Sequence, residues 1–123
     1  MQVFLVEDSL PVRERLAEML AAIPGITLAG SAASAESAIR DILQTRPDVV
    51  LLDLGLAAGG SGFEVLRGVR REAPEVDVYM LSNFASYPYR QLAERLGARD
   101  FFDKSRDLER VRELLAERAA AVQ

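Results

Sequence analysis

The chain has 123 residues, half of them hydrophobic, which is enough to bury the core of a single domain over residues 1–123. Its formal net charge of −4 gives no basic surface for nucleic acid or for an anionic membrane. Because histidine and cysteine are both absent, a Ser-His-Asp triad, a cysteine nucleophile and a thiolate metal site are excluded, which leaves carboxylates, hydroxyls and lysine for any chemistry.

Two hydrophobic periodicities alternate along the first half of the chain. Residues 3–6 form a short apolar run that predicts a buried strand, and this start lacks the basic stretch and cleavage site of a signal peptide. Apolar residues then recur at helical spacing over 12–23, behind Ser9 as the expected N-cap. A weaker strand over 26–30, suited to a sheet edge, precedes a second helix over 35–43. No apolar run reaches the roughly 18 residues of a membrane helix, so a cytoplasmic location is expected.

The second half of the chain continues the alternation. Strands are predicted at 48–52, 76–81 and 101–102, and helices after Ser61, up to Leu96 and from Leu108 onward. Ser61-Gly62-Phe63-Glu64 has the spacing of a capping box. Gly59-Gly60-Ser61-Gly62 is interpreted as a flexible loop. It lacks the third glycine or alanine of the nucleotide-binding G-x-G-x-x-G/A motif, and it also lacks the Lys-Ser/Thr of a phosphate-binding P-loop.

This order of elements predicts an α/β fold, a (βα)₅ doubly wound parallel sheet with helices on both faces. The three most apolar strands are the first, third and fourth, and such strands belong in the centre of a parallel sheet. The flavodoxin-like strand order 2-1-3-4-5 places them there with right-handed crossovers.

Polar side chains follow the predicted strands where the site of an open α/β sheet is expected, at the carboxyl ends. Glu7 and Asp8 follow the first strand, Asp53 the third, Ser82 the fourth and Lys104 the fifth. In the predicted order the first and third strands are neighbours, so the three carboxylates cluster. They repel one another unless a cation intervenes, and an all-oxygen ligand set suits Mg²⁺, with Mn²⁺ as the alternative.

This pattern of strand-end residues resembles the receiver domain of two-component response regulators, over essentially the whole chain. The resemblance implies that Asp53 is the phosphoacceptor and receives a phosphoryl group from a partner histidine kinase or phosphotransfer protein. It also implies that Glu7 and Asp8 hold Mg²⁺, directly or through water, together with Asp53 and the carbonyl of Gly55.

The resemblance assigns switching roles as well. Lys104 is expected to pair with Asp53 and then with the phosphoryl oxygens, while Ser82 hydrogen-bonds a phosphoryl oxygen. Phe101 matches the aromatic residue whose rotamer is coupled to activation, and we expect it to turn inward when Ser82 moves. The reshaped surface would then bind a downstream protein target.

Several positions depart from the common receiver pattern. The first acidic residue is Glu7, and Phe101 has no hydroxyl. Ser105 follows the lysine in place of proline, which puts the usual cis peptide in doubt. The loop after Asp53 lacks its usual proline and is one residue longer. Three further residues stand at positions that affect access to the acceptor or are commonly small: Gly55, Asn83 and Phe84.

Each of these residues also has a plainer interpretation. Glu7 and Asp8 would alone be read as solvated loop residues, Ser82 as a turn residue and Lys104 as a surface residue. For Phe101 a purely structural role in the core stays open.

Three functions remain open from the sequence. A single-domain regulator or relay is favoured, and a receiver from a larger regulator with a DNA-binding or enzymatic output domain is the alternative. A Mg²⁺-dependent phosphatase-like enzyme is disfavoured, because Gly55 stands where such enzymes carry a second Asp.

Overall fold

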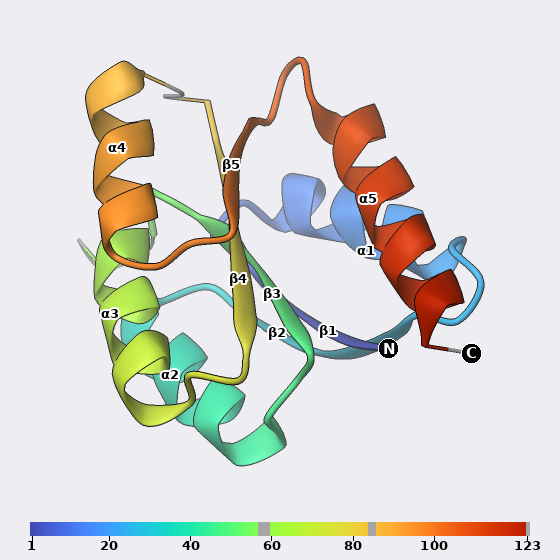
Figure 1. The fold of residues 1–123 in the computed structure, drawn as a ribbon, viewed down its shortest axis with the longest axis horizontal. Coiled ribbons are helices and arrows are strands. Elements are labelled where there is room, and N and C mark those ends of the chain that lie inside the picture. Colours follow the sequence, from blue (N-terminus) through green and yellow to red (C-terminus); the bar gives the residue numbers. More distant parts are fainter. Residues whose placement is uncertain (57–59, 84–85, 123) are drawn as a thin grey trace.

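In the computed structural model, which describes residues 1–56, 60–83 and 86–122, the chain alternates strands and helices throughout (Figure 1). The predictions for Gly59 and Phe84 lie outside the described residues. The elements are β1 (Gln2–Val6), α1 (Leu10–Ala21), β2 (Thr27–Ala32), α2 (Ala35–Thr45), β3 (Val49–Asp53), α3 (Gly62–Glu72), β4 (Asp77–Ser82), α4 (Tyr87–Arg95), β5 (Asp100–Asp103) and α5 (Leu108–Ala121).

The strands form one parallel sheet in the order β2-β1-β3-β4-β5, which confirms the predicted topology. The most apolar strands, β1, β3 and β4, occupy its centre, and the weak strand β2 lies at an edge. Helices α1 and α5 cover one face and α2, α3 and α4 cover the other (Figure 1). No helix in the described ranges is long and apolar enough to cross a bilayer.

Each face of the sheet carries its own buried core. In β1, Val3 and Leu5 pack with residues of α1 and α5, whereas Phe4 and Val6 pack with residues of α2 and α3. The alternation follows from the strand period of two, which sends successive side chains to opposite faces. Since both faces are covered, the central strands are apolar on both sides, and this explains why they read as continuous apolar runs rather than as alternating ones.

Two helix starts differ in detail from the expectation. Ser9 occupies the N-cap position of α1, but its side chain makes no capping hydrogen bond. The Oγ atom of Ser61 accepts a hydrogen bond from the backbone N–H of Phe63, at 3.1 Å, and not from that of Glu64 as a capping box requires. Ser61 is therefore an N-cap, as predicted, without the predicted capping-box bond.

Candidate functional site

The strand register brings the predicted carboxylates together. Val6 of β1 is aligned with Leu52 of β3, so Glu7 and Asp53 continue two adjacent strands at the same level of the sheet. Glu7, Asp8 and Asp53 each place a carboxylate oxygen within 4.8 Å of the others, which confirms that the three acidic side chains cluster.

Lys104 reaches this cluster from β5. Its Nζ atom lies 3.0 Å from Oδ2 of Asp53 and forms an ion pair with Oε1 of Glu7. Glu7, Asp53 and Lys104 can meet because they point to the same face of the sheet. Each lies two residues after a core residue that packs against α1 and α5, namely Leu5, Leu51 and Phe102. One ammonium thus compensates two carboxylates.

Burial decides the electrostatics of this group. The side chain of Glu7 is 1% exposed, and this burial raises the pKa of the carboxyl against the opposing hydrogen bonds from Lys104 and the backbone N–H of Ser9. Burial acts to lower the pKa of Lys104, but its hydrogen bonds and ion pairs with Glu7 and Asp53 outweigh that effect and raise the pKa above its ordinary value. The ammonium form of Lys104 is therefore favoured.

A hollow of about 390 Å³ opens above the cluster. It is lined by Asp8, Asp53, Gly55, Leu56, Gly60, Ser82, Asn83 and Lys104. Asp8 is exposed and Asp53 is 9% exposed, so both carboxylates can be reached from it. Glu7 does not line the hollow and lies against Lys104 instead.

The backbone after Asp53 forms a closed base for the following loop. Gly55 pairs with Ser61 in an isolated antiparallel bridge, which is made by hydrogen bonds from Gly62 N–H to the Leu54 carbonyl and from Leu56 N–H to the Gly60 carbonyl. In such a pair the N–H and C=O of Gly55 itself are not used by the bridge and point away from Ser61. Gly55 also lines the hollow described above.

These groups form an all-oxygen donor set of the kind that suits a hard divalent cation. Asp8, Asp53 and Gly55 line one hollow, and carboxylate oxygens of Asp8 and Asp53 lie within 4.8 Å of each other, which leaves coordination positions for water and for a substrate oxygen. The geometry therefore fits Mg²⁺ or Mn²⁺.

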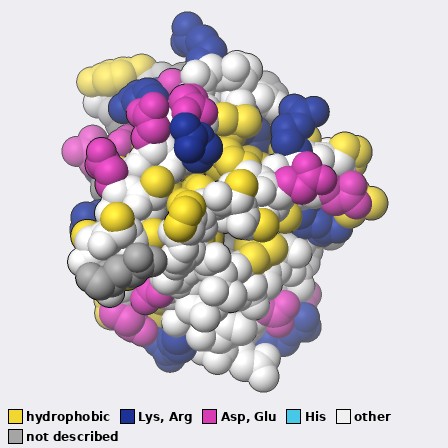
Figure 2. Space-filling view, turned by 90° about the vertical axis from the view of Figure 1, so that its right-hand side faces the viewer, with side chains coloured by type: hydrophobic (Ala, Val, Ile, Leu, Met, Phe, Trp, Pro, Cys, Tyr) yellow, Lys and Arg dark blue, Asp and Glu magenta, His cyan; other side chains and the backbone are white. Residues whose placement is uncertain are grey.

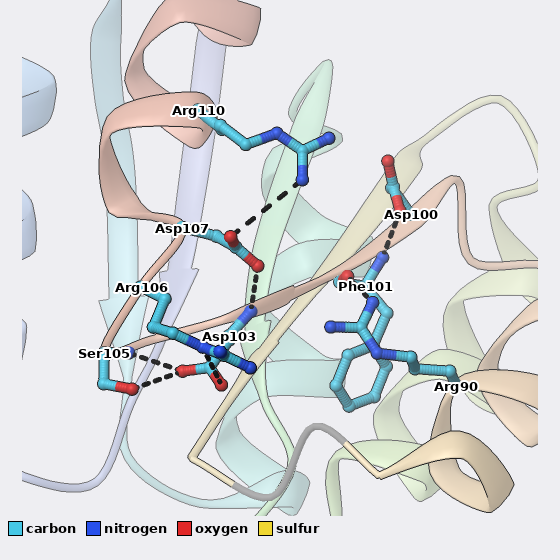
Figure 3. Close-up of polar contacts among 8 residues, drawn as sticks. All are labelled: Arg90, Asp100, Phe101, Asp103, Ser105, Arg106, Asp107 and Arg110. Carbon is cyan, nitrogen blue, oxygen red and sulfur yellow. Dashed lines mark hydrogen bonds and ion pairs between the residues drawn. The ribbon is translucent and has the colours of Figure 1, made fainter.

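Ser82 and Phe101 lie toward the other face of the sheet. Ser82 is 1% exposed and Phe101 is 4% exposed, and Phe101 belongs to the core that contains Ala93 of α4. The aromatic ring is thus buried in this structure, and its role in switching stays a prediction. Arg90 of α4 holds it there, because its Nη1 donates to the Phe101 carbonyl at 2.7 Å and its guanidinium lies 5.4 Å from the ring centre (Figure 3).

The polar network of the turn between β5 and α5 was not predicted from the sequence. Asp103, Ser105 and Asp107 are linked there by hydrogen bonds (Figure 3). A signal was present, because an Asp side chain in a turn commonly accepts a hydrogen bond from the backbone N–H two residues further on. No cis peptide occurs among the described residues, so the Lys104–Ser105 bond is trans.

A second, more apolar groove of about 230 Å³ lies beside the hollow, between α1 and the start of α5. It is lined by Val12, Arg15, Leu16, Asn83, Lys104, Ser105 and Leu108. On this side of the molecule apolar side chains are exposed among charged ones (Figure 2). Asn83 and Lys104 line both depressions, so the groove adjoins the hollow.

Comparisons with known proteins agree with this geometry. Residues 3–116 match the family model of the response regulator receiver domain. The chain is 31% identical to protein-glutamate methylesterase/protein-glutamine glutaminase 1 of Syntrophus aciditrophicus, over 94% of this chain and 37% of that protein. It is 30% identical to the probable C4-dicarboxylate response regulator DctR of Bacillus subtilis, over 93% of this chain and 50% of that protein.

A solved structure is also similar. The two-component response regulator of the LuxR family from Aurantimonas sp. SI85-9A1 superposes with a TM-score of 0.89 at 27% identity, covering 98% of this chain and 85% of that one. The chain spans only about a third to a half of the length of the two relatives compared by sequence.

Proposed function

The chain belongs to the response regulator receiver domain family, and on this premise we propose that it accepts a phosphoryl group on Asp53 from a histidine kinase or a phosphotransfer protein. The observation that carries the proposal is the setting of Asp53. It ends the central strand β3, opens into the hollow and has the Lys104 ammonium 3.0 Å from Oδ2. A donor histidine must lie outside residues 1–123, since this stretch contains no histidine.

The proposed transfer is an in-line displacement at phosphorus. A carboxylate oxygen of Asp53 attacks, a P–O bond forms, and the P–N bond to the donor imidazole breaks, with the nitrogen keeping the electron pair. Lys104 compensates the negative charge that gathers on the phosphoryl oxygens, and Ser82 donates a hydrogen bond to one of them. The groove between α1 and α5 adjoins the hollow and is the surface we assign to the donor protein.

The residues that would hold Mg²⁺ are Asp8, Asp53 and the carbonyl of Gly55, with Glu7 acting through water. A bound Mg²⁺ supplies charge compensation for the transferring group, and Mn²⁺ can serve in the same role. Glu7 is assigned the outer position because one of its oxygens pairs with Lys104 and the other accepts a hydrogen bond from Ser9.

The proposed output is a shift in population at the face formed by α4, β5 and α5, which binds a downstream protein. Ser82 and Phe101 share the face of the sheet that α4 covers, so a phosphoryl group that draws Ser82 toward Asp53 changes the packing beside Phe101. In this structure the ring is already buried, so the change we propose is in the fraction of molecules with this packing.

We propose that residues 1–123 act as one receiver unit in a single-domain regulator or relay. The alternative is a receiver joined to an output domain, because the matched relatives are two to three times as long as this chain. The boundaries of the full gene distinguish the two.

The test of the proposal is phosphorylation by a small-molecule donor. Wild-type protein incubated with Mg²⁺ and acetyl phosphate is expected to give a labile adduct, seen by intact mass and removed by hydroxylamine. Asp53→Asn should give none, whereas Asp41→Asn in α2, a residue that does not line the hollow, should behave as wild type. No adduct on the wild type, or an adduct that persists in Asp53→Asn, overturns the proposal.

A further inference from the structure

The turn that carries Lys104 is closed by the side chain of Asp103. Its Oδ1 atom accepts two hydrogen bonds, from the backbone N–H of Ser105 at 2.8 Å and from the Ser105 hydroxyl at 2.6 Å (Figure 3). Lys104 is the single residue between these two partners. The Asp103 side chain therefore spans the backbone of the lysine itself.

The backbone on either side of this turn is also fixed. The Asp107 carboxylate accepts from the Asp103 N–H at 2.9 Å, and the Asp103 carbonyl accepts from the Asp107 N–H at 2.8 Å. The Lys104 N–H donates to the Ser82 carbonyl on the neighbouring strand at 3.1 Å. These bonds restrict the position of the Lys104 Cα atom. On the C-terminal side of Lys104, the restriction comes from the hydrogen bonds between Asp103 and Ser105.

The position of that Cα matters because the lysine side chain is long and flexible. Its stem must lead Nζ to a point between Glu7 and Asp53, and Lys104 is only 11% exposed while doing so. A fixed backbone lowers the conformational entropy lost when the ammonium is held in one place. The same fixed backbone would also lower the entropy cost when Nζ contacts a phosphoryl oxygen.

We propose that Asp103 is a positioning residue, which holds the turn through Ser105 and so places the Lys104 ammonium for phosphoryl transfer to Asp53. The proposal rests on the phosphoacceptor function proposed above. It assigns Asp103 no contact with the phosphoryl group and none with a metal ion.

If Asp103 acted only through its negative charge, the two substitutions described next would have the same effect on the phosphorylation rate. Its carboxylate lies 3.7 Å from Nε of Arg106, whose side chain is 82% exposed, so its charge could matter on its own. Replacing Asp103 by Asn removes the charge but keeps an oxygen that can accept both bonds from Ser105. Replacing it by Ala removes both the charge and the acceptor. The difference between these two variants therefore measures the effect of the hydrogen bonds in the turn, separately from the effect of the charge.

The experiment measures the rate of phosphorylation by acetyl phosphate in Mg²⁺, extrapolated to saturating donor, and separately the affinity for Mg²⁺ alone. Asp103→Ala is expected to lose about tenfold in the saturating rate, because small misplacements of a catalytic group are costly. Asp103→Asn should stay within about twofold of wild type, and the Mg²⁺ affinity of both variants should change by no more than that. Arg106→Ala is the matched control and should be unchanged.

The possible outcomes separate the two proposals. If wild type takes no phosphoryl group, the proposed function itself fails. If wild type reacts and Asp103→Ala reacts equally fast, or if Asn is as slow as Ala, the positioning role is overturned. A parallel loss of rate and Mg²⁺ affinity in Asp103→Ala would mean general damage to the site and would also overturn it.

A milder variant covers the case in which Asp103→Ala does not fold. Ser105→Ala keeps the backbone N–H that Asp103 binds and removes only the hydroxyl bond. A loss of about threefold in the saturating rate is expected, in line with one hydrogen bond, again with unchanged Mg²⁺ affinity. Equal rates for Ser105→Ala and wild type would then count against the proposal.

Discussion

The Nζ atom of Lys104 lies 3.0 Å from Oδ2 of Asp53, while the same ammonium pairs with the buried Glu7. The lysine is therefore shared between the acceptor we propose and a carboxylate that does not line the hollow. This sharing couples the stability of the fold to the charge state of the site.

Lys104→Met is expected to destabilise the protein, because it leaves two largely buried carboxylates without their counter-charge. The expected loss in the free energy of unfolding is about 3 kcal/mol, as for a buried pair that loses one partner. Saturating Mg²⁺ should narrow the gap to wild type, since the lysine no longer competes for the carboxylates. Urea unfolding with and without Mg²⁺ measures both effects, and a gap that Mg²⁺ leaves unchanged would contradict this account.

Glu7→Gln is expected to change how stability depends on pH. Burial raises the pKa of Glu7 above its ordinary value of 4.5, so the native state binds this proton more tightly than the unfolded chain does. The resulting stabilisation is present below the unfolded pKa and is lost as pH rises through the native pKa. The free energy of unfolding of wild type, relative to the variant, should therefore fall with rising pH in that window. Urea titrations from about pH 4 to about pH 8 measure this difference; a constant difference would refute the prediction.

Gly62→Ala is expected to destabilise the protein by about 3 kcal/mol, at the upper end for overpacking. An added Cβ would lie 2.2 Å from the Asp53 carbonyl oxygen, which is rigid backbone. Gly55→Ala is the matched control, because a Cβ there meets nothing within 4 Å, and its effect should stay below about 0.5 kcal/mol. Thermal and urea unfolding of the two variants make the comparison, and equal losses would show that the close approach at Gly62 is relieved by movement of the loop.

Arg90→Met is expected to lower stability by about 1 to 2 kcal/mol, because it removes the bond to the Phe101 carbonyl and the cation–π contact with the ring. Arg95→Met, an exposed position on the same helix, should cost less than about 0.5 kcal/mol. Urea unfolding gives both values. Similar values for the two variants would mean that the Arg90 contact does not hold the ring.

The sequence was informative where a hydrophobic pattern alone determines a strand or a helix. The apolar runs at 3–6 and 48–52 predicted two neighbouring central strands, and the register that the structure shows for them brings Glu7 beside Asp53. The ion-pair partners of a side chain far away in the sequence were not predictable in the same way. Nothing local shows that Lys104 would pair with Glu7 as well as Asp53, since that depends on how two side chains share one ammonium.

The misjudged details have similar causes. The bond of Ser61 goes to Phe63 because the Gly55–Ser61 bridge sets the direction from which the chain enters α3. The burial of Phe101 could not be predicted, because Arg90, eleven residues earlier, covers the ring from a helix whose orientation is set only by packing. The Asp103–Ser105 turn could have been recognised from its pattern, but its link to the lysine requires the position of the sheet.

Lys104 is the only lysine in the chain, and every other basic side chain is arginine. Isotope labelling of lysine alone would therefore place a single nuclear magnetic resonance probe between the two carboxylates, without any substitution. Such a probe would report metal binding, phosphorylation and the integrity of the turn from one signal, in the unmodified protein.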